Sequence, residues 1–90
     1  MNTNQVIENL NKLSVLDLTI GNLESEIDII TDDLNKLIIH NIKTSLDSND
    51  LSQINMLRNK YLVQRQLLFE ANSQKKIIEN ALHLSSSSNV

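Results

Sequence analysis

The first half of this 90-residue chain contains a run of apolar residues that are separated alternately by three and four positions. The run consists of Leu13, Leu16, Ile20, Leu23, Ile27, Ile30, Leu34 and Leu37. These are the a and d positions of a heptad repeat, the pattern by which helices pack along a common seam. Val6 continues the pattern toward the N-terminus, and Asn9, Asn41 and Thr44 occupy a or d positions at its ends. We therefore predict one long helix over about residues 4–45.

The near absence of turn residues favours an all-α fold. The chain contains no Pro, and its single Gly is Gly21. Sheets and multi-loop folds need turn residues in quantity. Gly21 lies inside the heptad run, where it either interrupts the helix or sits on its outer face at a cost of about 1 kcal/mol relative to Ala. The seam passes through it unbroken, which favours the continuous helix, and a three-helix bundle is the alternative.

A short polar segment, residues 46–50, separates this run from a second helical pattern. Asp50, with Gln53 three residues later, has the form of a capping box, which predicts a second helix over about residues 51–84. The seam of this helix consists of Ile54, Leu57, Tyr61, Gln64, Leu68, Ala71, Lys75, Ile78 and Leu82. Residues 85–90 are too polar to pack, so we predict a disordered tail after a single-domain hairpin spanning residues 1–84.

A loop this short forces two helices to lie antiparallel. We therefore expect an all-α, coiled-coil-like hairpin with arms roughly 50–60 Å long, from about 1.5 Å of rise per residue. Acidic residues outnumber basic ones in the first helix, and the reverse holds in the second. This asymmetry either helps the two helices to pair or describes two solvated faces.

Composition argues against several classes of function. A net charge of −3 has the wrong sign for binding a phosphate backbone. No apolar run approaches the roughly 18 residues that span a bilayer, and the N-terminus lacks the pattern of a secretory signal. There is no Cys, so neither a disulfide nor a thiolate site can form. We expect a cytoplasmic protein that binds neither nucleic acid nor membrane.

No residue pattern predicts catalysis, a cofactor or a metal. His40 and His83 fall near opposite ends of the hairpin, about 40 Å apart by helix rise, which is too far for a shared ligand. The acidic stretch from Glu24 to Asp33 lacks the central Gly of a calcium loop and the Glu-x-x-His pairs of a bundle metal site. Within the two predicted helices, no His lies within helical reach of a candidate Ser nucleophile. We therefore expect a protein that is not an enzyme.

The two helices carry more aliphatic residues than one seam can cover. The residues that lie off the seam and are predicted to bind a partner are Leu62, Phe69, Ile77, Val15, Leu18 and Ile29. An apolar stripe this wide needs a cover. Either a second copy completes a four-helix bundle, or a helix of another protein occupies the stripe, or a monomer bends to cover it. The first two alternatives predict a homodimer or a heterodimer.

Two families of helical hairpins deserve comparison. Sporulation-type aspartyl-phosphate phosphatases open their second helix with a Ser-Gln-Glu-Leu-Asp motif. This chain has Ser52-Gln53-Ile54-Asn55-Met56 and lacks the acidic residues of that motif, so we reject the match. In its size, its acidic charge and its short polar turn before Leu51, the chain resembles the small co-chaperones of type III secretion needle subunits. That resemblance implies an adaptor or chaperone that packs an amphipathic partner helix against an apolar groove during bacterial protein secretion. The alternative is a structural homodimer without a client.

Overall fold

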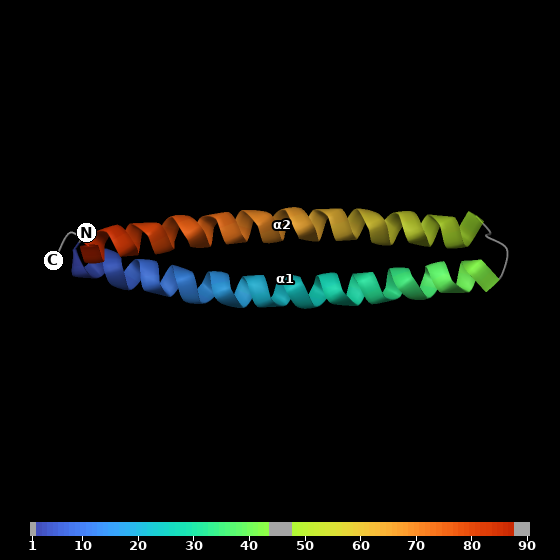
Figure 1. Cartoon of the computed structure of the whole chain (residues 1–90), viewed down its shortest axis with the longest axis horizontal. Helices are drawn as coiled ribbons and strands as arrows, with labels where there is room; N and C mark the ends of the chain where they lie inside the picture. Colours follow the sequence, from blue (N-terminus) through green and yellow to red (C-terminus); the bar gives the residue numbers. More distant parts are fainter. Residues whose placement is uncertain (1, 44–47, 88–90) are drawn as a thin grey trace.

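The chain forms two long helices. The computed structural model describes residues 2–43 and 48–87, with side chains described for 2–41 and 48–83. Helix α1 spans Thr3–Lys43 and helix α2 spans Ser48–Ser87. They lie side by side and run in opposite directions (Figure 1). The described residues contain no strand, and the predicted all-α antiparallel hairpin is confirmed.

The hairpin is a single layer with one seam. Its principal extents are 66, 18 and 14 Å, so it is several times longer than it is wide. The start of α1 and the end of α2 lie together at one end (Figure 1). In a two-helix layer each helix can bury only the side that faces its neighbour. The outer flanks of both helices are therefore open to any further partner.

The helix bounds differ from the sequence prediction mainly in α2. This helix begins at Ser48, so Asp50 lies in its first turn and not at the N-cap. A carboxylate in the first turn interacts favourably with the positive end of the helix dipole. The helix continues to Ser87 and includes three serines that we predicted to be tail, because no Gly or Pro stops it. Residues 44–47, which include Thr44 and the start of the predicted turn, and residues 88–90 lie outside the described residues.

A reciprocal pair of hydrogen bonds closes the N-terminus of α1. The backbone N–H of Gln5 donates to Oδ1 of Asn2 at 2.9 Å, and the backbone N–H of Asn2 donates to Oε1 of Gln5 at 3.1 Å. This is a capping box in which Asn and Gln take the usual places of Ser and Glu. It satisfies donors that the first turn of a helix otherwise leaves unpaired.

The core lies at the middle of the seam. The buried apolar residues among those described are Ile20, Ile27, Ile30 and Ala71, all at predicted a or d positions. The other described seam residues are half-buried, because a two-helix seam is covered from one side only. No polar or charged residue of the described part is fully buried. Helix pairing thus follows the heptad pattern, and the hairpin has a thin core.

Gly21 does not interrupt α1. The helix continues through it, its φ is not positive, and a Cβ built at this position would meet nothing within 4 Å. Gly21 therefore sits on the open face of an unbroken helix, as the heptad phase predicted. The alternative of a three-helix bundle is wrong.

A candidate partner-binding face

The hairpin exposes more large apolar residues than it buries in its described part. All six predicted partner-binding residues are exposed, from 56% for Leu62 to 68% for Leu18. Isolated exposed aliphatics are common on protein surfaces, whereas a continuous row of them marks an interaction surface. The arrangement of these six residues around the two helices therefore decides whether they form a site.

An ion pair across the seam fixes the register of the helices. Nζ of Lys75 on α2 lies 2.6 Å from Oδ1 of Asp17 on α1. Counting outward from this pair places Val15 level with Ile77, two residues away on each helix. Counting inward by twelve residues places Ile29 level with Val63. Apolar residues therefore occur in level pairs at two heights along the hairpin.

These four residues project from the same side of the hairpin. Val15 and Ile29 are two heptads apart on α1, and Val63 and Ile77 are two heptads apart on α2, so each pair shares one flank of its helix. Ile29 and Val63 line neighbouring hollows that share Lys60 and Gln64, which places the two flanks on the same side. We call Val15, Ile29, Val63 and Ile77 the Val15 face.

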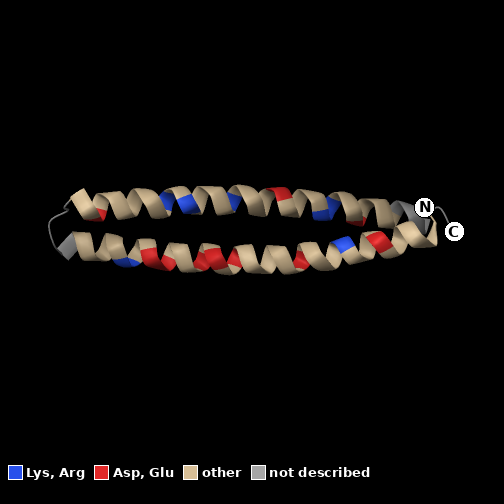
Figure 2. Ribbon diagram, turned by 180° about the vertical axis from the view of Figure 1, so that it is seen from behind, with Lys and Arg blue, Asp and Glu red and all other residues tan. Residues whose placement is uncertain are grey.

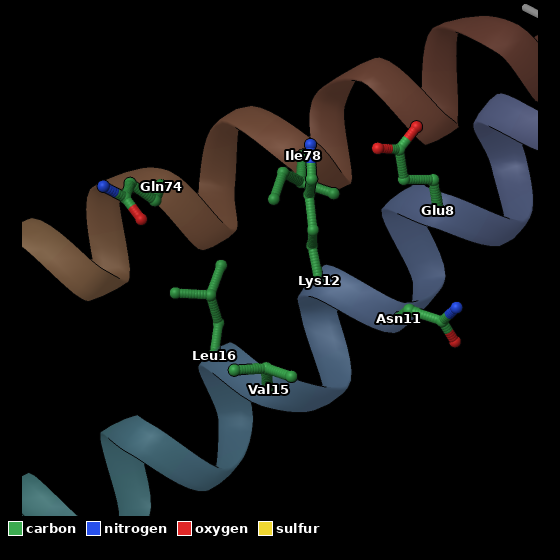
Figure 3. Close-up of a pocket in the computed structure, with 7 residues that line it drawn as sticks. All are labelled: Glu8, Asn11, Lys12, Val15, Leu16, Gln74 and Ile78. Carbon is green, nitrogen blue, oxygen red and sulfur yellow. The ribbon is translucent and has the colours of Figure 1, made fainter.

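The end of this face nearest the N-terminus is hollowed. An open groove of about 410 Å³ is lined by Glu8, Asn11, Lys12, Val15, Leu16, Gln74 and Ile78. Figure 3 shows the side chain of Leu16 pointing from α1 toward α2 and that of Lys12 reaching toward Ile78. The hydroxyl of Thr19 donates to the carbonyl of Val15 at 2.9 Å, so this hydroxyl is satisfied by its own helix. The groove has an apolar floor and a charged rim.

A second hollow on the same side lies beside a polar seam residue. Gln64 lines this hollow with Glu26, Ile29, Ile30 and Lys60. Oε1 of Gln64 is buried without a protein hydrogen-bond partner. A buried acceptor without a partner costs about 1–3 kcal/mol. Gln64 therefore weakens the seam next to the Val15 face.

The remaining predicted residues lie elsewhere, so the six do not form one surface. Phe69 lines a hollow with Arg65, Leu68 and Asn72, on the other flank of α2, and Leu62 is one heptad before it. Leu18 follows Val15 by three residues and occupies the outermost position of α1. Val15, Ile29 and Ile77 are brought together, whereas Leu62, Phe69 and Leu18 are not. Val63 completes the face and was missing from the prediction.

The charges of the two helices are segregated. Acidic residues are spread along α1 and most of the basic residues lie on α2 (Figure 2). Asp17 and Lys75 join the helices, whereas Asp32 and Lys36 pair within α1 at 3.0 Å. Pairs as exposed as these contribute little to stability, because water screens the attraction between their charges. Charge therefore helps to align the helices but does not hold them together.

The described residues hold no group of three or more His, Cys, Asp or Glu that could bind a metal. Among the same residues, neither helix has a stretch long and apolar enough to cross a membrane. Comparison of the chain with protein-family models, curated proteins and solved structures found no match.

Proposed function

We propose that the protein is a helix-binding adaptor or chaperone that packs an amphipathic partner helix against the Val15 face. One observation carries this proposal: four exposed aliphatic residues lie in two level pairs, two heptads apart, on one side of the two helices. A helix laid along this side can insert its own heptad residues between theirs, as in helix-in-groove recognition. The resulting assembly would be a three-helix bundle with a better covered seam.

The energy for such binding comes from apolar surface that the hairpin leaves in water. Val15, Ile29, Val63 and Ile77 are each more than half exposed. A large aliphatic side chain contributes about 1.5–3 kcal/mol when it passes from full exposure to burial. Much of that contribution is still available at each of the four positions. A partner helix would also cover the hollow that Glu26, Ile29, Ile30, Lys60 and Gln64 line.

The resemblance to co-chaperones of type III secretion needle subunits suggests a class of client. Such a client is a secreted, amphipathic helical protein that must be kept from associating before export. On this proposal the hairpin acts in the bacterial cytoplasm, by binding and without catalysis. The acidic α1 and basic α2 would then favour a client with charges of both signs.

The alternative function is a structural homodimer, a four-helix bundle without a client. Its support is the matched placement of Val15 with Ile29 and of Val63 with Ile77 about a common midpoint. Such symmetry suits a second copy of the same surface. The two functions differ in whether a different protein ever occupies the Val15 face.

A capture experiment with paired variants tests the adaptor. The tagged protein is used to retrieve partners from its source cytoplasm, and the partners are identified by mass spectrometry. We expect a helical protein whose recovery is lost with Val15→Glu and Ile29→Glu. Leu18→Glu is the matched control, because Leu18 is as exposed as Val15 but lies off the face. Phe69→Glu tests the opposite flank and should keep the partner.

Circular dichroism of each variant separates lost binding from lost folding. All four variants replace exposed residues, so each should keep the helicity of the parent chain. Equal recovery of the partner by Val15→Glu and the parent would contradict the adaptor proposal. Loss with Phe69→Glu but not with Val15→Glu would move the binding site to the other flank.

A further inference from the structure

We propose that a second copy of the hairpin covers the Val15 face when no client is bound, about a two-fold axis that runs across the hairpin along the line from Asn22 to Glu70. This inference rests on the proposed function, since it names a further occupant of the same face. It follows from an internal symmetry of the residues on that face. A closed dimer needs a surface that is complementary to itself, with each residue contacting the partner's counterpart.

Asn22 and Glu70 mark the midpoint of the face. Asn22 lies seven residues from both Val15 and Ile29, and Glu70 lies seven residues from both Val63 and Ile77. Asn22 and Glu70 are also level with each other, because each is five residues inward from the Asp17–Lys75 pair. One straight line across the hairpin, through Asn22 and Glu70, therefore lies midway between the two aliphatic pairs of the Val15 face.

A two-fold rotation about this line stacks two hairpins with their ends reversed. Each α1 then lies antiparallel on the partner's α1, and each α2 on the partner's α2. Val15 falls on the partner's Ile29, and Val63 falls on the partner's Ile77. Aliphatic residues thus meet aliphatic residues at four places along the interface, two on each pair of stacked helices and two heptads apart.

The charges that flank the face obey the same symmetry. Glu8 and Lys36 occupy the same heptad position as Val15 and lie equally far from Asn22, so the rotation brings Glu8 to the partner's Lys36. Lys12 and Asp33 also share a heptad position and lie almost equally far from Asn22, so the rotation brings Lys12 close to the partner's Asp33. Lys36 also binds Asp32 of its own helix, but both side chains of that pair remain about two-thirds exposed or more. Opposite charges therefore meet at both ends of the stacked α1 helices, which supports a second copy as the occupant.

A two-fold axis along the hairpin is the competing arrangement. It would place Val15 on the partner's Ile77 and Ile29 on the partner's Val63, which also matches aliphatic residues. However, it would separate Glu8 from the partner's Lys36 and Lys12 from the partner's Asp33. The crosswise axis keeps both the apolar and the charged matches, so the geometry points to that arrangement.

The crosswise axis also limits the affinity of one copy for the other. Glu70 comes to face the partner's Glu70, and like charges in contact are unfavourable. In the hairpin this carboxylate accepts a hydrogen bond from Nε2 of Gln66 at 3.3 Å and is exposed. The repulsion weakens the homodimer without affecting the fold of either copy. A client helix can then displace the second copy from the Val15 face.

Single-cysteine variants test the axis directly, since the chain has no Cys of its own. Asn22→Cys places its thiol beside the partner's thiol and should form an intermolecular disulfide on mild oxidation. Gly21→Cys is the matched control. Gly21 is next to Asn22 but lies on the opposite flank of α1, and a Cβ at this position would meet nothing within 4 Å. A double variant, Val15→Cys with Ile77→Cys, would instead cross-link between copies about the lengthwise axis. Cross-linking of Gly21→Cys as fast as Asn22→Cys, or preferential cross-linking of the double variant, overturns the proposal.

Sedimentation equilibrium of the full chain provides the second measurement. We expect a dimer for the parent, a dissociation constant raised at least about tenfold by Val15→Glu, and one lowered about fivefold by Glu70→Gln. A parent that stays monomeric at millimolar concentration overturns the dimer, and so does a Glu70→Gln dimer no tighter than the parent. A monomer that still captures a client through Val15 leaves the proposed function intact. A symmetric dimer that captures no client overturns the adaptor and leaves the structural homodimer.

Discussion

Nζ of Lys75 lies 2.6 Å from Oδ1 of Asp17, so a lysine at a seam position is paired with the opposite helix. A charged residue in a heptad seam normally weakens it. Lys75 avoids much of this cost, because its side chain remains about one-third exposed and its ammonium group is paired with Asp17. The pair thus holds the register from which the Val15 face is built.

This pair predicts a dependence of stability on alkaline pH. Hydrogen bonding to Asp17, followed by the attraction of its charge, raises the pKa of Lys75 above the usual 10.5. The native state therefore holds this proton more tightly than the unfolded chain does. The stabilisation is fully present below pH 10.5 and is lost as the pH rises through the native pKa. We expect the urea midpoint of the parent to fall between pH 10 and 12 more steeply than that of Asp17→Asn.

Two controls isolate the effect of the seam pair. Asp32→Asn removes the other described ion pair, within α1, which also raises a lysine pKa but does not join the helices. Because the seam pair is partly exposed, its effect should decrease at 1 M salt, where the Debye length is about 3 Å. Parallel pH curves for the parent and Asp17→Asn would show that the contact contributes nothing in solution.

Gly21→Ala should stabilise the hairpin. Gly costs about 0.8–1.0 kcal/mol relative to Ala in a helix interior, and a Cβ at this position meets nothing within 4 Å. For a domain of this size that corresponds to a rise in melting temperature of roughly 4–8 °C per kcal/mol. Thermal unfolding followed by circular dichroism measures it. An unchanged or lower melting temperature would mean that the open face at Gly21 is occupied in solution.

The hairpin itself could be predicted from sequence because its seam is a local and repeated pattern. The gaps from Leu13 to Leu37 specify helix, phase and buried side, and the structure buries Ile20, Ile27 and Ile30 of that run. The continuity of α1 through Gly21 followed from the same phase. One clear heptad repeat therefore predicts both an element and its packed face.

The binding face could not be predicted because it depends on register between the helices. Phe69 and Ile77 both lie off the seam of α2, but they project from opposite flanks. The Asp17–Lys75 pair, and the groove that Val15 lines with Gln74 and Ile78, show that Ile77 is level with Val15. Val63 is not among the six predicted residues, although its two-heptad spacing to Ile77 is visible in the sequence. Helical position within each heptad would have separated the two flanks.

The N-terminal capping box makes a separate prediction. Asn2→Ala removes the acceptor for the backbone N–H of Gln5 and should cost about 1 kcal/mol. Asn2→Ser keeps an acceptor at the N-cap and should restore most of that loss. Chemical unfolding of the three proteins compares the free energies. Equal stability of Asn2→Ala and the parent would indicate that the first turn of α1 does not contribute to the cooperative unit.

Asn41 is a polar seam residue that we expect to restrict the oligomeric state of the protein. Both polar atoms of its amide are buried with no protein hydrogen-bond partner, at an a position of α1. Because buried unpaired groups cost about 1–3 kcal/mol, Asn41→Ile should raise the melting temperature. A polar a residue can also restrict register and oligomeric state, so the same variant should give mixed oligomers on size-exclusion chromatography. Asn35→Ile makes the same chemical change at an exposed position and should alter neither property. If Asn41→Ile instead elutes as one sharp peak at the size of the parent, Asn41 is only a local cost and does not specify the assembly.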